Sequence, residues 1–336
     1  MRRQIINCVK IFLFLINPLI ALNVGYNGYG YEPDFKLDSI LLEKVSKKNC
    51  HVFAVDLFNV EIKNHKLYDT KNQVIIDKLI FLGFLRKDIG KIQSIHQNTD
   101  CKLILFIYEP PTVCPEYYEK RKINNFDKIY TFQDDIIDNK KFFKFYYDVK
   151  NPMCTNSIKF ENKKLCCLST SKFFSNDPNE LYSERLKAIE FFEKNHPEDF
   201  SFGGKRGWEK CEYPRTFKGL IQDKTAFLQQ HKFCVCYENT KELPGYVTEK
   251  IFDCFKAGCI PIYWGAPNIT DYIPPNCFID KRDFSSYEKL YDFISSMQEE
   301  EYNIYIQNIE NYLESPKAEV YSREQHLKLL EFIILN

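Results

Sequence analysis

The sequence predicts an α/β protein with mainly parallel sheets, divided into two compact domains. The chain has 336 residues, which is long enough for two domains that each bury a core of their own. Strand-like apolar runs alternate with helical patterns along the chain, and this alternation favours βαβ units. The composition is 44% hydrophobic, 16% aromatic and 27% charged, which is typical of a globular protein rather than a disordered or fibrous one.

The charge balance disfavours one class of function. Lys plus Arg and Asp plus Glu number 46 each, and no cluster of cations with interleaved aromatic residues is present. Binding to duplex nucleic acid is therefore not expected. A solenoid is also not expected, because the sequence contains no repeat with a period of about 20 to 50 residues.

The N-terminus carries a possible targeting segment. Two arginines and Lys10 precede an apolar stretch from Ile11 to Leu22 that Asn17 and Pro18 interrupt. This stretch is short for a membrane span, which needs about 20 apolar residues, and it fits the basic and apolar regions of a signal peptide. We expect residues 1–22 to be a signal peptide or a short membrane anchor, with a buried strand or helix as the alternative.

The 13 cysteines contain no pair with C-x-x-C spacing, so zinc ribbons and thioredoxin-type redox sites lack their usual pattern. Cys234 and Cys236 lie in an apolar run and are expected to act as small buried hydrophobic residues. Some cysteines would pair in a secreted protein.

In the first half, the apolar runs predict several strands and one helix. "CKLILFIYEPP", from Cys101, predicts a buried strand that stops at Glu109 before two prolines. "VIIDKLIFLGFL", from Val74, has apolar spacing compatible with a helix. The other strand-like runs begin at His51, Phe126 and Lys141.

Polar residues accumulate between Asn151 and Lys164, which predicts a domain junction there. The second half then restarts with a strand, "LCCLSTSKFF". "SERLKAIEFFEKN" predicts an amphipathic helix with Ser183 as its N-cap. Residues 203–207, "GGKRG", are expected to form a flexible loop. Further helical patterns begin at Ser285, Glu301 and Ala318.

The most informative stretch is "YENTKELPGYVTEKIFDCFKAGCIPIYWG", Tyr237 to Gly265. An apolar strand ends at Glu238 and Asn239, and Thr248 is a suitable N-cap for a helix that opens with Glu249 and Lys250. Ligands of open α/β sheets bind at the carboxyl ends of the strands. A helix N-terminus with an added cation attracts phosphate, and a carboxylate accepts hydrogen bonds from sugar hydroxyls.

This stretch therefore predicts a nucleotide-sugar site. The alternative is that Glu249 only complements the helix dipole and Lys250 is a solvated charge.

The strings "YEN", "YVTEK", "AG" and "IPIYWG", in this order and spacing, resemble the α-1,3-fucosyltransferase family, whose members are inverting enzymes that use GDP-fucose. The family more often has Phe at the position of Tyr237, Ser at Thr240 and an acid at Gly245. The resemblance is strongest from His231 to Phe284 and becomes weaker toward both ends of the chain.

The resemblance implies a GT-B type glycosyltransferase architecture with two Rossmann-like domains that face each other. Residues 23–158 would form the acceptor-binding domain and residues 159–316 the GDP-fucose-binding domain. Residues 317–336 would form a C-terminal helix that packs across the interface between them.

The resemblance also implies roles for single residues. "YEPP" is similar to the family's Glu-Ser-Pro segment, which places Glu109 at the position of the catalytic base, and "SERLKAIEFF" places Arg185 at the donor diphosphate. Glu249 and Asn239 would hold sugar hydroxyls. The full donor-binding set is Arg185, Glu238, Asn239, Tyr246, Val247, Thr248, Glu249 and Lys250.

The expected reaction is transfer of L-fucose from GDP-fucose to a hydroxyl of N-acetylglucosamine in a glycan acceptor, with α-1,3 linkage and inversion. The acceptor would be an oligosaccharide or a glycoprotein. The family implies no tightly bound cofactor and no obligatory metal, and the acids between Asp134 and Asp138 are better explained as a solvated strand end.

The expected location, from residues 1–22, is the secretory pathway or a Golgi-type membrane, with possible membrane association through this segment. Two alternatives to the expected function remain. One is an inverting two-domain transferase that uses another nucleotide sugar, and the other is a glycan-binding pseudoenzyme.

Overall fold

The computed structural model describes residues 10–16, 20–25, 51–53, 60–70, 74–83, 88–155, 158–204 and 206–336. The chain forms two compact units. The N-terminal unit comprises residues 1–145 and 326–336, and the C-terminal unit comprises residues 146–325. The two units therefore divide between Phe145 and Tyr146, and the last eleven residues group with the first unit.

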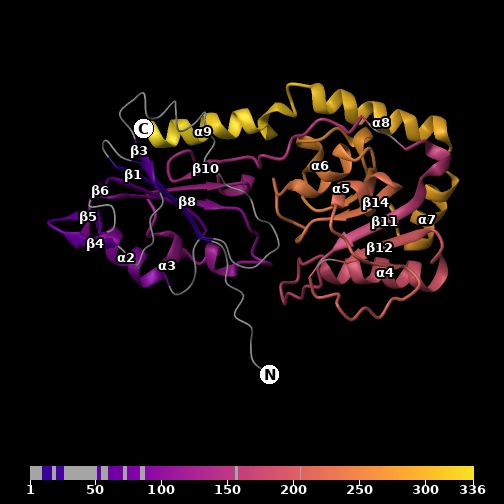
Figure 1. Cartoon of the computed structure of the whole chain (residues 1–336), viewed down its shortest axis with the longest axis horizontal. Helices are drawn as coiled ribbons and strands as arrows, with labels where there is room; N and C mark the ends of the chain where they lie inside the picture. The colour runs from indigo at the N-terminus through magenta and orange to yellow at the C-terminus, as the bar shows by residue number, and fades with distance from the viewer. Residues whose placement is uncertain are drawn as a thin grey trace. The chain divides into compact units, whose positions relative to one another are not determined.

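The N-terminal unit contains a seven-stranded mixed sheet and a small antiparallel sheet of three strands. The order in the large sheet is β10-β9-β8-β7-β1-β2-β3, and β7, β8, β9 and β10 run parallel to one another. In Figure 1, α2 and α3 lie on one side of this sheet and α9 on the other.

The strands of the large sheet are β1 (Lys10–Ile16), β2 (Ile20–Gly25), β3 (His51–Phe53), β7 (Lys78–Leu82), β8 (Lys102–Ile107), β9 (Lys128–Thr131) and β10 (Phe142–Lys144). The small sheet contains β4 (Val60–Lys63), β5 (Lys66–Asp69) and β6 (Val74–Ile76). The helices are α2 (Ile89–Asn98), α3 (Lys120–Ile123) and α9 (Arg323–Leu335), which enters this unit at His326.

The helix predicted from Val74 is wrong, because this segment forms β6 and β7. Leu79, Ile80 and Phe81 are all completely buried, so β7 is covered on both faces. A strand buried on both faces is apolar at every position, and its pattern cannot be told from that of a buried helix.

The N-terminal segment forms two strands of the large sheet, β1 and β2, which pair antiparallel. This is the strand alternative that the sequence left open for residues 1–22. The leader or anchor and the secretory location stay predictions. Among the described residues, the model contains no helix with the length and apolar character to cross a membrane.

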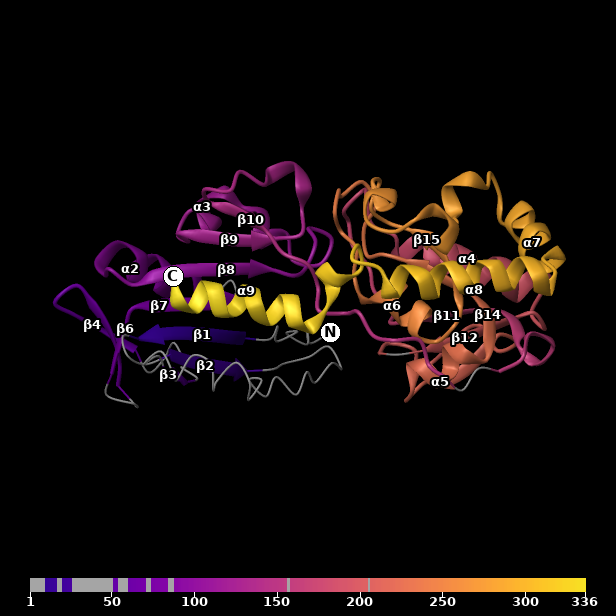
Figure 2. The same cartoon turned by 90° about the horizontal axis from the view of Figure 1, so that it is seen from above.

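The C-terminal unit is a three-layer α/β/α structure around a six-stranded sheet of order β13-β12-β11-β14-β15-β16, in which every pair is parallel. Numbered from β11, this is the 3-2-1-4-5-6 order of a doubly wound Rossmann sheet. The predicted α/β class with parallel sheets is confirmed. Figures 1 and 2 show α4 on one face of the sheet, with α5 and α6 on the other.

The strands of this sheet are β11 (Lys164–Thr170), β12 (Phe200–Gly204), β13 (Phe217–Leu220), β14 (His231–Tyr237), β15 (Ile260–Trp264) and β16 (Ile279–Asp280). The helices are α4 (Tyr182–Asn195), α5 (Lys224–Gln229), α6 (Glu249–Lys256), α7 (Tyr287–Ser296) and α8 (Glu299–Glu314).

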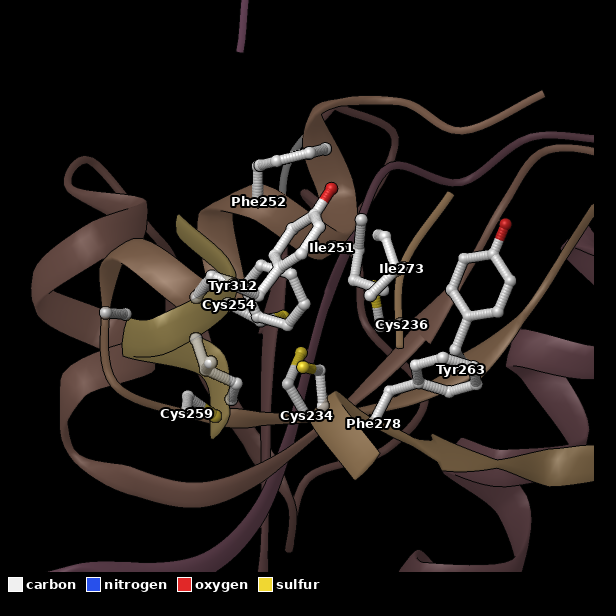
Figure 3. Close-up of a cluster of buried hydrophobic side chains, with 14 of the residues drawn as sticks. Cys234, Cys236, Ile251, Phe252, Cys254, Cys259, Tyr263, Ile273, Phe278 and Tyr312 are labelled. Atoms are coloured by element: carbon white, nitrogen blue, oxygen red, sulfur yellow. The ribbon is translucent and has the colours of Figure 1, made fainter. Parts of the chain in front are cut away.

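Strand β14 divides its side chains between the two cores of this unit, as the period of two in a strand requires. Phe233, Val235 and Tyr237 pack with residues of α4 and α7. Cys234 and Cys236 pack on the other face with residues of α5, α6 and α8. Figure 3 shows the two cysteines with labelled residues of α6 and α8. Both thiols are buried and free, which confirms their predicted role as small buried hydrophobic residues.

Two local predictions in this unit are wrong. Helix α4 begins at Tyr182, so Ser183 is not the N-cap; instead the Glu180 carboxylate accepts hydrogen bonds from the backbone N–H of both residues. Gly203 and Gly204 belong to strand β12 rather than to a loop. A Cβ on Gly204 would lie 2.7 Å from the Phe217 ring, so close packing explains this glycine.

Candidate functional site

The sheet of the C-terminal unit has its switch point between β11 and β14. These neighbouring strands are paired through Cys166 with Phe233 and Cys167 with Cys234, and the chain winds outward from them in opposite directions. Ligands of doubly wound sheets bind outside the carboxyl ends of the strands at such a point. The residues that follow Thr170 and Tyr237 are therefore the first candidates for a binding site.

Arg185 joins the carboxyl ends of these two strands. It projects from the first turn of α4 and is only 7% exposed. Its Nη2 donates to the carbonyl oxygens of Tyr237 at 2.6 Å and Glu238 at 2.7 Å. Nη1 donates to Thr170 Oγ1 at 3.4 Å. The guanidinium is thus fixed at the switch point by backbone acceptors.

Glu238, Thr248 and Lys250 form a second cluster beside this arginine. The Glu238 side chain is completely buried, and its Oε2 lies 2.9 Å from Lys250 Nζ. Oε1 accepts a hydrogen bond from the Thr248 backbone N–H at 2.9 Å. Thr248 Oγ1 in turn accepts from Lys250 Nζ at 3.0 Å. The cluster links the end of β14 to the start of α6.

Helix α6 starts at this cluster because of its sequence. Thr248 has extended backbone angles and its side chain accepts from the Lys250 backbone N–H, which confirms the predicted N-cap. Ile251, Phe252 and Phe255 bury the apolar face of the helix. Gly258, with φ of +60°, ends it in the left-handed conformation that glycine adopts without strain.

The charges at the start of α6 are strongly coupled. Burial lowers the pKa of Lys250, but Glu238 and Glu249 outweigh this effect and raise it above its ordinary value. Burial raises the pKa of Glu249, but Lys250 and Lys224 outweigh this effect and hold it at about 2. Lys224 also forms an ion pair with Asp253 at 2.5 Å. Both groups at the helix start are therefore ionised at neutral pH.

The remaining residues of the predicted donor set are held inside the protein. Asn239 Oδ1 accepts from Arg185 Nη2 at 3.0 Å, and its Nδ2 donates to the Tyr246 hydroxyl at 3.4 Å. Tyr246 and Val247 are each 1% exposed. The predicted residues of the C-terminal unit thus lie in one connected region, around the ends of β14 and α6.

A small hollow lies against Arg185 on the β11 side. It is lined by Thr170, Ser171, Lys172, Phe173, Tyr182, Arg185, Leu186 and Trp208. The Lys172 ammonium is 5.0 Å from the centre of the Trp208 ring. Neither this group of residues nor Lys224 was predicted from the sequence. The polar run after the apolar strand at residues 165–170 could have indicated the hollow, whereas nothing local distinguishes Lys224.

Glu109 lies in the N-terminal unit, two residues after the end of β8, and is partly buried. Its backbone carbonyl accepts a hydrogen bond from the Tyr118 hydroxyl at 3.0 Å. Burial, together with the charges of Glu109 and Cys114, raises the pKa of Tyr118 well above its ordinary value. The carboxyl end of β8 thus carries an acid close to a partly buried phenol.

Several acids of the N-terminal unit form ion pairs or hydrogen bonds within the protein. Glu119 pairs with Lys122 at 2.7 Å, and Asp134 pairs with Lys144 at 2.7 Å. Asp138 Oδ1 accepts hydrogen bonds from three successive backbone N–H groups of residues 140–142. The described residues contain no group of three or more His, Cys, Asp or Glu that could hold a metal ion.

Comparison with known families gives one match over half of the chain. The model of the C-terminal part of glycosyltransferase family 10 (fucosyltransferase) matches residues 161–328. This range contains the parallel sheet, Arg185 and the whole Glu238 cluster.

Curated relatives match over shorter stretches. An α-(1,3)-fucosyltransferase of Helicobacter pylori is 36% identical over 115 residues, which is 33% of this chain and 24% of the relative. An α-(1,4)-fucosyltransferase of Arabidopsis thaliana is 37% identical over 21% of this chain and 17% of its own length. GDP-fucose protein O-fucosyltransferase 3 of Xenopus laevis is 36% identical over 19% and 15%. The matches thus span about a quarter or less of these relatives.

The fold is shared with solved structures. A crystal structure of an α1,3-fucosyltransferase aligns with a TM-score of 0.51 and 19% identity, covering 78% of each chain. The structure of TarM aligns with a TM-score of 0.54 and 11% identity over 82% of this chain and 63% of TarM. The expected GT-B type architecture with Rossmann-like units is therefore confirmed.

Proposed function

Because the chain belongs to glycosyltransferase family 10, the fucosyltransferases, we propose that it transfers L-fucose from GDP-fucose to a hydroxyl of a glycan acceptor. The observation that carries the proposal is the pair of cations, Arg185 and Lys250, fixed at the sheet's switch point beside a helix N-terminus. Backbone N–H groups at a helix start and fixed cations are the groups that bind a diphosphate.

In this proposal the donor lies at the C-terminal unit. Arg185, Lys250 and the first turn of α6 receive the diphosphate. Glu249 is ionised and 36% exposed, so its carboxylate can accept hydrogen bonds from the hydroxyls of fucose or ribose. Asn239, Tyr246 and Val247 support this region from inside, since their side chains are partly or almost fully buried.

The proposed chemistry is a single inverting displacement at the anomeric carbon of fucose. The acceptor oxygen forms the new bond while the bond to the β-phosphate oxygen breaks, and its electron pair leaves with GDP. Negative charge develops on the β-phosphate, where preorganised cations are worth most in a site shielded from water. Lys250 and Arg185 supply the positive charge that stabilises it, from positions that the protein has already fixed.

We propose Glu109 as the general base that takes the proton of the acceptor hydroxyl. A general base must come within hydrogen-bond reach of the acceptor hydroxyl, and the resemblance to the family's Glu-Ser-Pro segment gives this place to Glu109. Its place after β8, next to the Tyr118 hydroxyl, supports this role.

For the acceptor, we propose N-acetylglucosamine in an oligosaccharide or glycoprotein, with α-1,3 linkage. The first relative is named as an α-(1,3)-fucosyltransferase, and its match is longer than those of the α-(1,4) and protein O-fucosyltransferase relatives. Transfer to the 4-hydroxyl of a sugar or to a protein hydroxyl is the second candidate, which these other names favour.

The donor is tested first by thermal unfolding with GDP, UDP and their sugar conjugates. A ligand at 100 times its dissociation constant adds about 2.7 kcal/mol of stability. We expect GDP and GDP-fucose to raise the melting temperature and UDP to leave it unchanged. Stabilisation by UDP alone would show that the protein is a transferase for another nucleotide sugar.

The reaction is tested by incubating GDP-fucose with N-acetyllactosamine and with an acceptor peptide. We expect fucosylated disaccharide whose linkage NMR assigns to the 3-hydroxyl with α configuration. Donor binding without transfer to either acceptor would favour the glycan-binding pseudoenzyme instead.

A further inference from the structure

Glu238 is the acid whose role the proposed chemistry leaves open. It directly follows β14, and its side chain is 0% exposed. An ionised carboxylate is costly to bury unless a cation and hydrogen-bond donors compensate it. The cost of burying Glu238 at the edge of the proposed donor site indicates that the carboxylate has a role there.

Both carboxylate oxygens of Glu238 are already occupied. Oε1 accepts from the Thr248 backbone N–H and lies 2.9 Å from Thr248 Oγ1. Oε2 lies 2.8 Å from the same hydroxyl and 2.9 Å from Lys250 Nζ. All of these partners belong to the N-cap and first turn of α6. The carboxylate thus faces the start of α6.

The neighbouring strand is also shaped around this carboxylate. Gly265 follows β15, and a Cβ built on it would lie 2.6 Å from Glu238 Cγ and would also meet the Tyr263 hydroxyl. The backbone of Gly265 is not in the left-handed region, so glycine is not required by the backbone conformation. It is required because a side chain would collide with Glu238 and Tyr263. Two strand ends therefore make room for one buried acid.

We propose that Glu238 is a positioning residue: it holds Lys250 Nζ and the first turn of α6 in the geometry that receives the donor diphosphate, and it does not contact the donor. The proposal rests on the proposed function, because it requires the diphosphate to lie at Lys250. It changes the role expected from the sequence, which placed Glu238 among the donor-binding residues.

The physical reason is the environment of Lys250. A lysine side chain is long and flexible, and ordering it has an entropic cost. The like charge of Arg185 also repels the Lys250 ammonium. The fixed carboxylate of Glu238 opposes both effects, so the ammonium is in place before the donor arrives.

The same contacts predict a pH dependence in a variant. The charged groups that face Lys250 are Glu238 after β14, Glu249 on α6 and Arg185 on α4. In Glu238→Gln, burial and Arg185 still disfavour the charged amine, and of these three charged groups Glu249 alone still favours it, with Oε1 at 3.4 Å from Nζ. The pKa of Lys250 then falls, and the proton is lost as pH rises through the lowered value.

The experiment measures GDP affinity by calorimetry from about pH 7 to about 9.5, below the ordinary lysine pKa of about 10.4. We expect Glu238→Gln to bind GDP at least about tenfold more weakly than the wild type at pH 7, with a ratio that grows as pH rises. Glu242→Gln is the matched control, because Glu242 is an exposed acid in the same loop.

A double-mutant cycle separates positioning from direct contact. If Glu238 acts through Lys250, adding Glu238→Gln to Lys250→Ala changes GDP affinity by less than about twofold. If Glu238 contacts the donor, the glutamine weakens binding by the same factor in both backgrounds, which would overturn the proposal.

Two further measurements keep the test decisive. Gly265→Ala pushes on the Glu238 side chain without changing any charge, and we expect it to weaken GDP binding while thermal unfolding shows a folded protein. The Lys250 pKa, followed by NMR of labelled lysine without ligand, should be lower in Glu238→Gln than in the wild type. An unchanged pKa would overturn the proposal even if glutamine impaired binding.

Failure of the proposed function is distinguished from failure of this proposal by GDP binding to the wild type. A wild-type protein that does not bind GDP at any pH overturns the donor assignment, and this proposal with it. A wild type that binds GDP, with Glu238→Gln equal to it at both ends of the pH range, overturns this proposal alone.

Discussion

Replacing Arg185 by alanine should destabilise the C-terminal unit as well as abolish donor binding. The guanidinium donates to the carbonyl oxygens of Tyr237 and Glu238 and to Asn239 Oδ1. Alanine removes the donor of these three hydrogen bonds, and because Arg185 is only 7% exposed, the acceptors lose it at a buried position. The loss therefore reaches the end of β14 directly.

The size of the effect follows from these three bonds. A hydrogen bond to a charged group contributes roughly 1.5 to 3 kcal/mol. Bonds of one network are not additive, and removing the arginine relieves its repulsion of Lys250. We therefore expect a loss of about 4 kcal/mol. For a unit of this size, about 2 to 4 °C per kcal/mol gives a melting temperature lower by about 8 to 16 °C.

Scanning calorimetry of the full chain measures this shift, with Arg215→Ala as the control. Arg215 is exposed and donates to the carbonyl of Glu193, so its loss should cost less than about 1 kcal/mol. Arg185→Lys should fall between the wild type and alanine, because lysine keeps the charge but not the fork of donors. An alanine variant that melts within about 2 °C of the wild type would refute the bridging role of Arg185.

Three further predictions concern single residues. Lys250→Ala should reduce turnover by roughly 10²- to 10³-fold, the usual effect of removing a preorganised charge at a developing oxyanion; near-normal single-turnover rates in a folded variant would place the diphosphate elsewhere. Glu109→Gln should reduce turnover by roughly 10²- to 10⁴-fold while GDP-fucose affinity stays nearly unchanged. Glu116 lies in the short turn of residues 115–118, beyond the two prolines that follow Glu109, and a loss of turnover in Glu116→Gln instead would assign the base to Glu116. Burial lowers the pKa of His231 from 6.5 to about 4. Between these two pH values the unfolded state binds more protons than the folded state, so stability is lost as pH falls, by about 3 kcal/mol in all. Urea unfolding at both pH values should show this loss in the wild type and a smaller one in His231→Asn. An equal change in the free energy of unfolding with pH in the two proteins would contradict the prediction.

The sequence was sufficient to predict the segment from β14 to the end of α6. Strand β14 is apolar without interruption from Phe233 to Tyr237, Thr248 is an N-cap that bonds locally, and Gly258 ends the helix. Each of these signals acts over a few residues, so no knowledge of distant contacts is needed to interpret it. The placement of Lys250 at a helix start and of Glu238 at a strand end followed from the same local rules.

The sequence was not sufficient where a segment's environment decides its structure. The run from Val74 became strands because β7 pairs with β1 and β8 along its edges and is covered on both faces, and Gly204 entered β12 where Phe217 packs against it. An apolar pattern records that side chains are buried, but not whether a helix or a neighbouring strand buries them.

The arrangement of the site was decided by the tertiary structure alone. Arg185 lies more than 50 positions from the carbonyls that it binds, and only the pairing of β11 with β14 brings α4 to the end of β14. Glu238 is a strand-end acid in the sequence, but in the fold it is a completely buried partner of Lys250. Burial and hydrogen-bond partners are set by all the elements that surround a side chain, and these elements meet only when the whole sheet has formed.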